Sequence, residues 1–410
     1  MSAALPLVND LAFKREAHAR FAELRERGPV HHVTQPNGLD LYLVVGYDAA
    51  RTALAHPDLG KDPVIAAAKL ESAGVTVYQG GGRGLGANML MADGADHTRL
   101  RGPVAKAFTP RRIESLRPRV QQITDALLDA VEARAAAGHE VDLVAEFTAP
   151  LPVTVICELL GVPLAAQDDF RRWTQAALNG GSAVPGEEAR AGAVALNGYL
   201  AELIAEKRKQ PGDDLLSALV AISDADGGAL SEAELLGTAV ILVVAGHETT
   251  VNLLGNALAA LLDRPDQARL LRERPELLPG AVEEFLRWDA PVEQSTMRFA
   301  RRDVELAGAV VPAGSVVVVA LAAAGRDERA AADPATLDVT RTDGRHLSFG
   351  HGIHYCLGAP LARLEGEIAL GTVLRRLPGL RLRCAYGELD WTPAGIMHGP
   401  LALPAVLAEV

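Results

Sequence analysis

The chain has 410 residues, of which 49% are hydrophobic and 22% charged, and its 40 Lys and Arg against 52 Asp and Glu give a net charge of −12. This composition is that of a globular protein and excludes a disordered or collagen-like chain. The negative net charge disfavours general binding to nucleic acid, because it repels the phosphate backbone.

The cysteines and the N-terminus indicate a reducing compartment. Cys157, Cys356 and Cys384 are too few, and odd in number, for a disulfide framework. The first ten residues lack the basic segment and apolar run of a signal peptide. We therefore expect a cytoplasmic protein.

Helical periodicity dominates the chain. Apolar residues recur at spacings of three and four from Phe13 to Leu24 and from Ile113 to Val131. The longest predicted helix covers residues 231–262, where Ser231 and Glu234 form a capping-box pattern. Further helices are predicted over residues 151–160, 168–178, 187–209, 214–222, 266–274, 279–288 and 360–377.

Strands are fewer and short. Residues 41–45 predict one strand, and the tail from 380 to 410 predicts several. Residues 306–325 carry no charge and are about as long as a membrane-spanning helix. However, Pro312-Ala313-Gly314 interrupts them, so we predict two strands within 304–319 joined by that turn. The fold prediction is one mainly helical domain over residues 1–410 with a small β-rich region.

The segment 57–93 is long, weakly periodic and rich in glycine, as functional or mobile loops are. Its Gly82-x-Gly84-x-x-Ala87 is a loose match to a dinucleotide fingerprint. That fingerprint needs a helix directly after it and an acidic residue about 20 residues on. Neither is present, so a flexible loop is the better interpretation.

The most informative segment is FGHGIHYCLG at 349–358. Cys356 follows a glycine-rich loop and precedes a predicted helix that has Pro360 in its first turn. A helix N-terminus favours the thiolate, the form of cysteine that binds metal. The glycines leave room for a flat ligand, and backbone N–H groups of the loop can hydrogen-bond the sulfur.

Three interpretations of this segment remain open on local pattern alone. Cys356 could be an ordinary buried thiol. It could bind catalytic zinc with His351 and His354, as in a zinc-dependent hydrolase, although three ligands within six residues of one loop rarely reach a tetrahedral face together. It could be the axial ligand of haem iron, in an enzyme or in a non-catalytic sensor. The local pattern favours haem.

The same segment resembles the haem-ligand loop of the cytochromes P-450. AGHETT at 245–250 resembles the oxygen-binding motif of that family, and EFLR at 284–287 resembles its Glu-x-x-Arg motif. The resemblance extends from Phe13 to about Pro404 and is closest to soluble actinobacterial members that tailor macrolides and other polyketides. It implies the single-domain P-450 fold, a triangular prism of helices around haem.

The resemblance also implies a function. We expect a haem-thiolate monooxygenase that hydroxylates or epoxidises a bulky apolar secondary metabolite with O2 and two electrons from a ferredoxin. Cys356 is then the axial ligand of haem b, iron protoporphyrin IX. The other cofactor-binding residues expected from the family pattern are His97, Arg101, Ala245, Arg298, Phe349, Gly350, His354 and Gly358.

Glu248 and Thr249 are the expected catalytic residues. The Thr249 hydroxyl can bond to the carbonyl of Ala245 and loosen the helix there, while Glu248 brings protons from solvent. The alternative for Thr249 is a mid-helix threonine that only bonds back to its own helix. Glu284 and Arg287 have the spacing of a surface ion pair, but the motif order favours a buried structural pair.

Partners and substrate can be outlined. No flavin or iron–sulfur segment is present, so we expect a separate ferredoxin and ferredoxin reductase, docking on a basic patch. We expect no nucleic-acid or membrane partner, and a monomer. The loops 57–93 and 179–187 are expected to form a roomy mouth. The predicted patch comprises Lys106, Arg111, Arg112, Arg345 and Arg363, and the predicted substrate-lining residues are Leu90, Val244, Ala245, Val292 and Met397.

Overall fold

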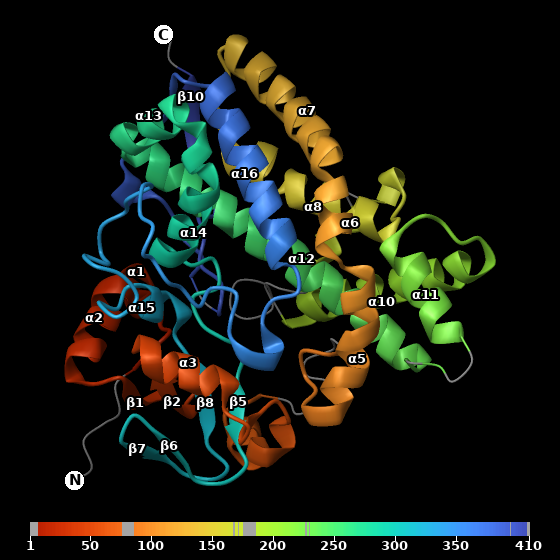
Figure 1. The fold of residues 1–410 in the computed structure, drawn as a ribbon, viewed down its shortest axis with the longest axis vertical. Helices are drawn as coiled ribbons and strands as arrows, with labels where there is room; N and C mark the ends of the chain where they lie inside the picture. Colours follow the sequence, from red (N-terminus) through yellow and green to blue (C-terminus); the bar gives the residue numbers. More distant parts are fainter. Residues whose placement is uncertain are drawn as a thin grey trace.

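The computed structural model, drawn in Figure 1, describes residues 7–75, 86–166, 169–170, 172–174, 186–225, 228, 230–393 and 395–407. The match to a dinucleotide fingerprint at 82–87 lies mostly outside these residues. The same is true of most of the predicted helix 168–178 and of the predicted loop 179–187.

The long helix α12 (Glu232–Asp263) occupies the centre of the molecule (Figure 1). The predicted capping box is confirmed, since the Ser231 side chain accepts from the Glu234 N–H and the Glu234 side chain accepts from the Ser231 N–H. By length and composition this helix could cross a membrane, but 67% of its most apolar window is buried inside the protein. Its apolar sequence therefore serves the core.

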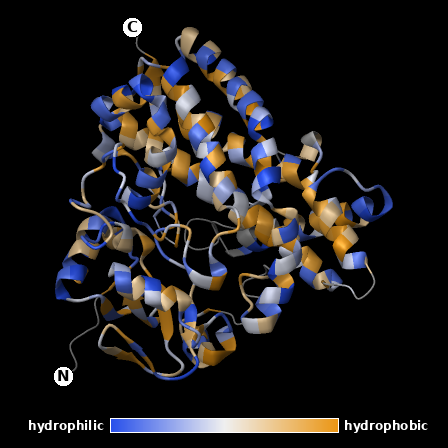
Figure 2. Ribbon diagram, viewed as in Figure 1, coloured by the Kyte–Doolittle hydropathy of each residue, from blue (hydrophilic) through white to orange (hydrophobic). Residues whose placement is uncertain are grey.

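The other helices surround α12. Figure 2 shows hydrophobic and hydrophilic residues alternating along the outer helix α7, as expected for a helix with one face on the core. Helices α8, α10, α14 and α16 pack directly against α12. The helices are α1 (Leu11–Arg15), α2 (Ala17–Arg27), α3 (Tyr47–Ala55), α4 (Ala67–Ser72), α5 (Gly94–Ala107), α6 (Pro110–Ser115), α7 (Arg117–Ala136), α8 (Pro150–Leu160), α10 (Gly186–Lys209), α11 (Leu215–Asp224), α13 (Pro265–Glu273), α14 (Leu278–Trp288), α15 (Leu321–Gly325) and α16 (Ala359–Arg376).

Three small sheets complete the fold. The largest has the strand order β1-β2-β8-β5-β3, in which β2 and β8 run parallel and the other neighbours run antiparallel. The second has the order β4-β10-β9, and the third pairs β6 with β7. The strands are β1 (Val30–Thr34), β2 (Asp40–Val44), β3 (Leu59–Gly60), β4 (Val141–Asp142), β5 (Arg298–Ala300), β6 (Val304–Leu306), β7 (Ala309–Val311), β8 (Val316–Val319), β9 (Leu380–Leu382) and β10 (Pro404–Leu407).

The strand β8 shows why its sequence is four valines in a row. Val316 and Val318 pack into the hydrophobic cluster that holds Phe13 and Phe21 of the N-terminal helices. Val317 and Val319 face the opposite cluster, which includes residues of α3. Because successive strand residues point to opposite faces and both faces are covered, every position is apolar.

The prediction of two strands within 304–319 is wrong in its division. The chain makes three strands there: β6 and β7 form a hairpin, and β8 joins the large sheet. The turn between β6 and β7 is Ala307-Gly308, whose φ values of +50° and +84° suit a two-residue hairpin. Pro312-Ala313-Gly314 instead connects β7 to β8. An alanine in a left-handed conformation gave no turn signal in the sequence.

Other departures are smaller. The predicted helix around 113–131 is divided into α6 and α7, and the N-terminal one into α1 and α2. The predicted loop 57–93 contains a short 3-10 turn, Pro63–Ala66, followed by α4. Short helical turns of this kind have too few residues to show periodicity.

Glu284 and Arg287 form the buried structural pair that motif order indicated. Arg287 Nε donates to Glu284 Oε2 at 2.7 Å and Nη2 to Oε1 at 2.8 Å, and both side chains are 1% exposed. Arg341 Nε donates to the same Oε1 at 3.1 Å. Gly325 lies against this network, because a Cβ there would be 2.4 Å from the Arg287 carbonyl oxygen.

We predict that Glu284→Gln destabilises the fold strongly. The substitution removes the buried counter-charge of Arg287 and leaves Arg341 with the exposed Asp343, so the free energy of unfolding should fall by about 3–5 kcal/mol. Denaturant unfolding measures this. The control is Glu114→Gln, which removes an exposed pair with Arg117 and should change little. Equal midpoints for the two variants would contradict the structural role.

Candidate functional site

Cys356 lies at the end of a loop that is closed by its own backbone. The Cys356 N–H donates to the carbonyl of Phe349 at 2.8 Å, around the 3-10 turn Gly352–His354. Helix α16 begins at Ala359, with Pro360 in its first turn. The expectation that Cys356 directly precedes a helix N-terminus is therefore confirmed.

The loop glycines do not all make room for a ligand. Gly350 and Gly352 have φ values of +73° and +77°, which favour glycine. A Cβ on Gly352 would lie 3.1 Å from the Cα of Ala55, so this glycine lets the loop pack on α3. Gly358 is the one beside the sulfur, since its Cβ would lie 3.8 Å from Cys356 Sγ. Gly352 therefore serves packing, and Gly358 stays the glycine predicted to make room for a flat ligand.

The Cys356 sulfur has several groups around it that favour the thiolate. Its side chain is exposed, yet burial by the surrounding protein raises the pKa of the thiol. The backbone N–H groups of Gly358 and Ala359 and the Arg101 guanidinium act in the opposite direction. Cys157 lies buried within α8, and burial raises the pKa of its thiol to about 12. Cys356 is thus the cysteine suited to bind a metal ion.

Positively charged and imidazole groups gather next to Cys356. Arg101 Nη2 donates to the Tyr355 carbonyl at 2.7 Å, and the rings of His97 and His354 meet at 4.5 Å between centroids. Arg298 is buried and its Nη1 donates to the Leu59 carbonyl at 3.1 Å. Four residues expected to bind the cofactor are therefore brought together.

Several donors in this cationic cluster lack partners. In the part of the chain that the structure describes, His97 Nε2 and Arg298 Nε are buried without a hydrogen bond, and the nearest acid to His354 Nε2 is Asp93, whose Oδ1 is 3.7 Å away. Burial and the neighbouring His354 and Arg101 lower the pKa of His97 to about 4, and burial lowers that of Arg298 to about 10. Buried polar groups are normally satisfied, so these unpaired nitrogens indicate a place for an anionic ligand.

Two residues of the cluster were not predicted from sequence. Lys61 is buried, and its Nζ donates to the carbonyls of Thr296 and Met297 at 3.2 and 3.1 Å. Asp93 lies 3.7 Å from His354 Nε2 and accepts from Arg301 Nη2 at 2.8 Å. Lys61 follows directly after β3, and a single lysine next to a two-residue strand carries no sequence signal for burial.

The AGHETT segment interrupts the burial of α12. Ala245 is exposed and Gly246, Glu248 and Thr249 are half-buried, whereas the residues on either side are buried. Thr249 Oγ1 donates to the Ala245 carbonyl at 3.0 Å, as expected. A Cβ on Gly246 would lie 3.0 Å from Ile156 Cδ1, so that glycine serves packing on α8. Ala245 is the small residue that faces open space.

Two ionisable side chains lie beside this accessible stretch. Burial raises the pKa of Glu248, whose Oε2 lies 4.0 Å from His247 Nε2. His247 Nδ1 lies 2.8 Å from the Val243 carbonyl, and burial lowers the pKa of this histidine. A neutral imidazole that donates through Nδ1 has Nε2 free as an acceptor. Glu248 and His247 are therefore neighbouring ionisable groups, but their closest side-chain atoms are too far apart for a direct hydrogen bond.

The predicted substrate-lining residues are partly brought together. Val292 and Met397 pair across an antiparallel bridge. Val244 and Ala245 are neighbours on α12, and Leu90 is half-buried in the loop before α5.

The basic patch is only partly as predicted. Lys106 and Arg111 are exposed, but Arg363 donates to Glu283 Oε1 at 2.6 Å and Oε2 at 2.8 Å and is neutralised.

The geometry does not support the zinc interpretation. Among the residues that the structure describes, one group of three potential metal ligands has its ligand atoms within 4.8 Å of one another: His18, Asp289 and His398. His351 instead lies 3.4 Å from Arg51 Nε, which donates to it. The 3-10 turn at 352–354 separates His351 from Cys356.

Comparison with known proteins places the chain among close relatives. The family model described as Cytochrome P450 matches residues 187–378. Cytochrome P450 107B1 of Saccharopolyspora erythraea is 47% identical over 402 residues, covering 97% of this chain and 96% of that protein. Mycinamicin IV hydroxylase/epoxidase of Micromonospora griseorubida is 43% identical over 389 residues, covering 94% of each.

Solved structures agree with this similarity. The tirandamycin C-bound P450 monooxygenase TamI superimposes with a TM-score of 0.89 at 42% identity, over 98% of this chain and 100% of that one. The predicted mainly helical fold around a haem site, with a small β-rich region, is thereby confirmed.

Proposed function

Because the chain belongs to the cytochrome P450 family and is a haem-thiolate monooxygenase, we propose that it oxidises a bulky apolar secondary metabolite of the macrolide or polyketide type. One oxygen atom of O2 enters the substrate as a hydroxyl or epoxide, and the other leaves as water with two electrons and two protons. When bound, haem supplies the iron that activates O2.

The observation that carries this proposal is the cationic cluster beside Cys356. We propose haem b, because its two propionates are anions that would give partners to His97 Nε2 and Arg298 Nε, which are buried and unpaired within the described part of the chain, and would add negative charge beside His354. Arg101 would add a further cation. Cys356 would bind the iron through its thiolate, held by the N–H groups of Gly358 and Ala359.

The substrate class is supported by relatives and by the site. Proteins similar over nearly the whole chain are named for the hydroxylation or epoxidation of mycinamicin IV and for binding tirandamycin C. In this chain Leu90, Val244, Ala245, Val292 and Met397 are the proposed lining residues, all of them apolar.

The substrate proposal is tested by titrating the purified protein with a compound library and recording the spin state of the iron. Macrolides, other polyketides and terpenoids of similar bulk should change it. If only small polar compounds do so, the proposed substrate class is wrong.

We propose that Thr249 and Glu248 deliver protons to the oxygen site. The Thr249 hydroxyl donates its proton in a hydrogen bond to the Ala245 carbonyl. The hydroxyl oxygen therefore keeps its lone pairs to accept a hydrogen bond from water. Glu248 projects about 100° away around the helix, and burial raises its pKa, which favours the protonated form of this carboxyl group. The buried His247 lies beside it, with its Nε2 4.0 Å from Glu248 Oε2.

Electrons are proposed to come from a ferredoxin, reduced by a ferredoxin reductase. The exposed Lys106 at the end of α5 and Arg111 in α6 are free to attract an acidic partner. Arg345 is exposed as well, although its Nη2 donates to the Arg329 carbonyl at 2.8 Å. Arg363 is excluded from the docking surface because Glu283 neutralises it.

The first prediction from this proposal concerns Cys356. Reduced protein exposed to carbon monoxide should show the red-shifted Soret band of thiolate ligation, and Cys356→His should lose that band. The matched control is Cys157→Ser, which should keep the band. Retention of the band by Cys356→His would rule out Cys356 as the ligand.

The second prediction concerns proton delivery. Thr249→Ala should keep haem and substrate binding but divert electrons to hydrogen peroxide, and Glu248→Gln should slow turnover by about 10²–10⁴-fold with little peroxide. The readout is product formed per reductant consumed. Thr238→Ala, on the same helix about three turns away, is the control. An unchanged ratio of product to reductant in Thr249→Ala would show that Thr249 has no role in proton delivery.

The third prediction concerns docking. The rate of reduction by an acidic ferredoxin should fall steeply as salt rises, because screening weakens long-range attraction. Lys106→Ala and Arg111→Ala should slow it at low salt. Arg269→Ala, an exposed arginine on α13 at the far end of the molecule in Figure 1, should not. A rate that is flat across ionic strength would refute this docking surface.

A further inference from the structure

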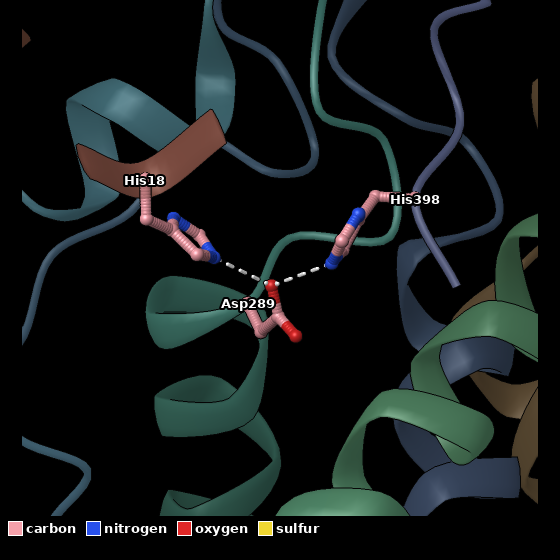
Figure 3. A group of neighbouring side chains, drawn as sticks. All are labelled: His18, Asp289 and His398. Atoms are coloured by element: carbon pink, nitrogen blue, oxygen red, sulfur yellow. Dashed lines mark hydrogen bonds and ion pairs between the residues drawn. The ribbon is translucent and has the colours of Figure 1, made fainter. Parts of the chain in front are cut away.

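A second group of ionisable side chains lies apart from the cationic cluster. His18 comes from α2, Asp289 ends α14, and His398 lies in the segment before β10 (Figure 3). Asp289 Oδ1 accepts from His18 Nε2 at 3.0 Å and from His398 Nε2 at 3.2 Å. Asp289 is 3% exposed. The cluster therefore joins three distant parts of the chain.

Two histidines and a carboxylate are also a common set of metal ligands, but here hydrogen bonding accounts for the arrangement. Both imidazoles reach the same carboxylate oxygen at hydrogen-bond distance. The positive charge of Arg326 lies near enough to lower the pKa of His18, after the effect of burial. A metal ion bound here would add a second positive charge next to Arg326, and the repulsion between the two would disfavour metal binding.

The His398 ring is held from several sides. Trp391 stacks parallel to it, with ring centroids 4.8 Å apart and planes 1° apart, and His18 approaches edge-on at 6.0 Å. The backbone is held as well. Asn256 Nδ2 on α12 donates to the carbonyls of both Asp289 and His398, each at 3.1 Å.

Lys14 anchors the same region from α1. Its side chain is buried, and its Nζ donates to Glu293 Oε1 at 3.0 Å. The same nitrogen donates to the carbonyls of Gly395 and Met397, each at 3.2 Å. The N-terminal helices thus supply two side chains, Lys14 and His18, that tie residues 289–293 to residues 395–398.

Between these anchors lies the pair Val292 and Met397. His398 N–H donates to the Pro291 carbonyl at 3.0 Å and Glu293 N–H donates to the Ile396 carbonyl at 2.8 Å, which fixes the pairing. Since successive residues of an extended segment point to opposite sides, holding His398 in the cluster directs Met397 away from it.

We propose that Lys14, His18, Asp289 and His398 are positioning residues that set Met397 and Val292 against the substrate and so determine which substrate carbon is oxidised. This inference rests on the proposed function, in which these two apolar side chains line the substrate site. Its physical basis is that a displacement of about 1 Å in a positioning contact can change the rate by about a hundredfold.

The test compares holoenzyme variants, using whichever compound changes the wild-type spin state most, of any class. His398→Ala should weaken its binding by about tenfold or more and should broaden the product distribution, because Val292 and Met397 would no longer hold the compound in one orientation. His398→Arg keeps a cationic donor to Asp289. It should therefore restore most of the binding affinity and most of the wild-type product distribution. His18→Ala, at the more exposed edge of the cluster, should give a milder form of the same change.

Controls separate this inference from the proposed function. His139→Ala, in an exposed loop, should behave as wild type, and Met397→Ala should broaden the products as His398→Ala does. The carbon monoxide band must be unchanged in every variant. If bulky apolar compounds fail to change the spin state of the wild type, that result counts against the proposed substrate class alone.

Two results would overturn the inference. The first is unchanged binding and product ratio in both His398→Ala and His18→Ala. The second is one zinc ion per chain in the purified wild type that is lost in Asp289→Asn, since the cluster would then be a metal site.

Discussion

The buried carboxylate of Glu284 is the constraint on which the rest of the site depends. It accepts from two guanidinium groups, Arg287 and Arg341, and these are satisfied further by carbonyls of the segment 325–336. Neighbouring residues of α14 carry the constraint outward. Glu283 binds Arg363 of α16 and His346, and the Leu286 carbonyl accepts from Ser348. The loop that presents Cys356 is thus fixed from α14, and Asp289 at the end of the same helix binds His18 and His398.

The cationic cluster beside Cys356 is a place where a bound anion would stabilise the folded protein. Lys61, His97, Arg298 and His354 are brought into the interior, where Asp93 is the acid near them. Burial lowers the pKa of each of the four, which means that their charged forms are destabilised without a counter-anion. A dianionic ligand would relieve this, and anything that binds only the folded state stabilises it.

Local signals in the sequence predicted much of this arrangement. Contacts between residues far apart in the chain were not predicted. The Ser231–Glu234 capping box, the back-bond of Thr249 and the position of Cys356 before a helix depend on a few adjacent residues, and all three are present. The role of Gly352 was misjudged because its neighbour, Ala55, is about 300 residues away in the chain. The cluster of His18, Asp289 and His398 escaped notice for the same reason, since periodicity reports only which face of an element is buried. The division of 304–319 was wrong because Gly308 alone was a weaker turn signal than Pro312-Ala313-Gly314, and Ala307 takes a left-handed conformation that is unusual for alanine.

The central claim is that Cys356 is the residue that binds the haem iron. X-ray absorption at the iron edge of the resting holoenzyme tests it most directly, because a sulfur neighbour scatters differently from nitrogen or oxygen. The measurement is made on the double variant Cys157→Ser/Cys384→Ser, in which Cys356 is the remaining cysteine. We predict one sulfur atom at bonding distance from the iron in this variant, as in the wild type. A spectrum with nitrogen and oxygen neighbours alone would contradict it.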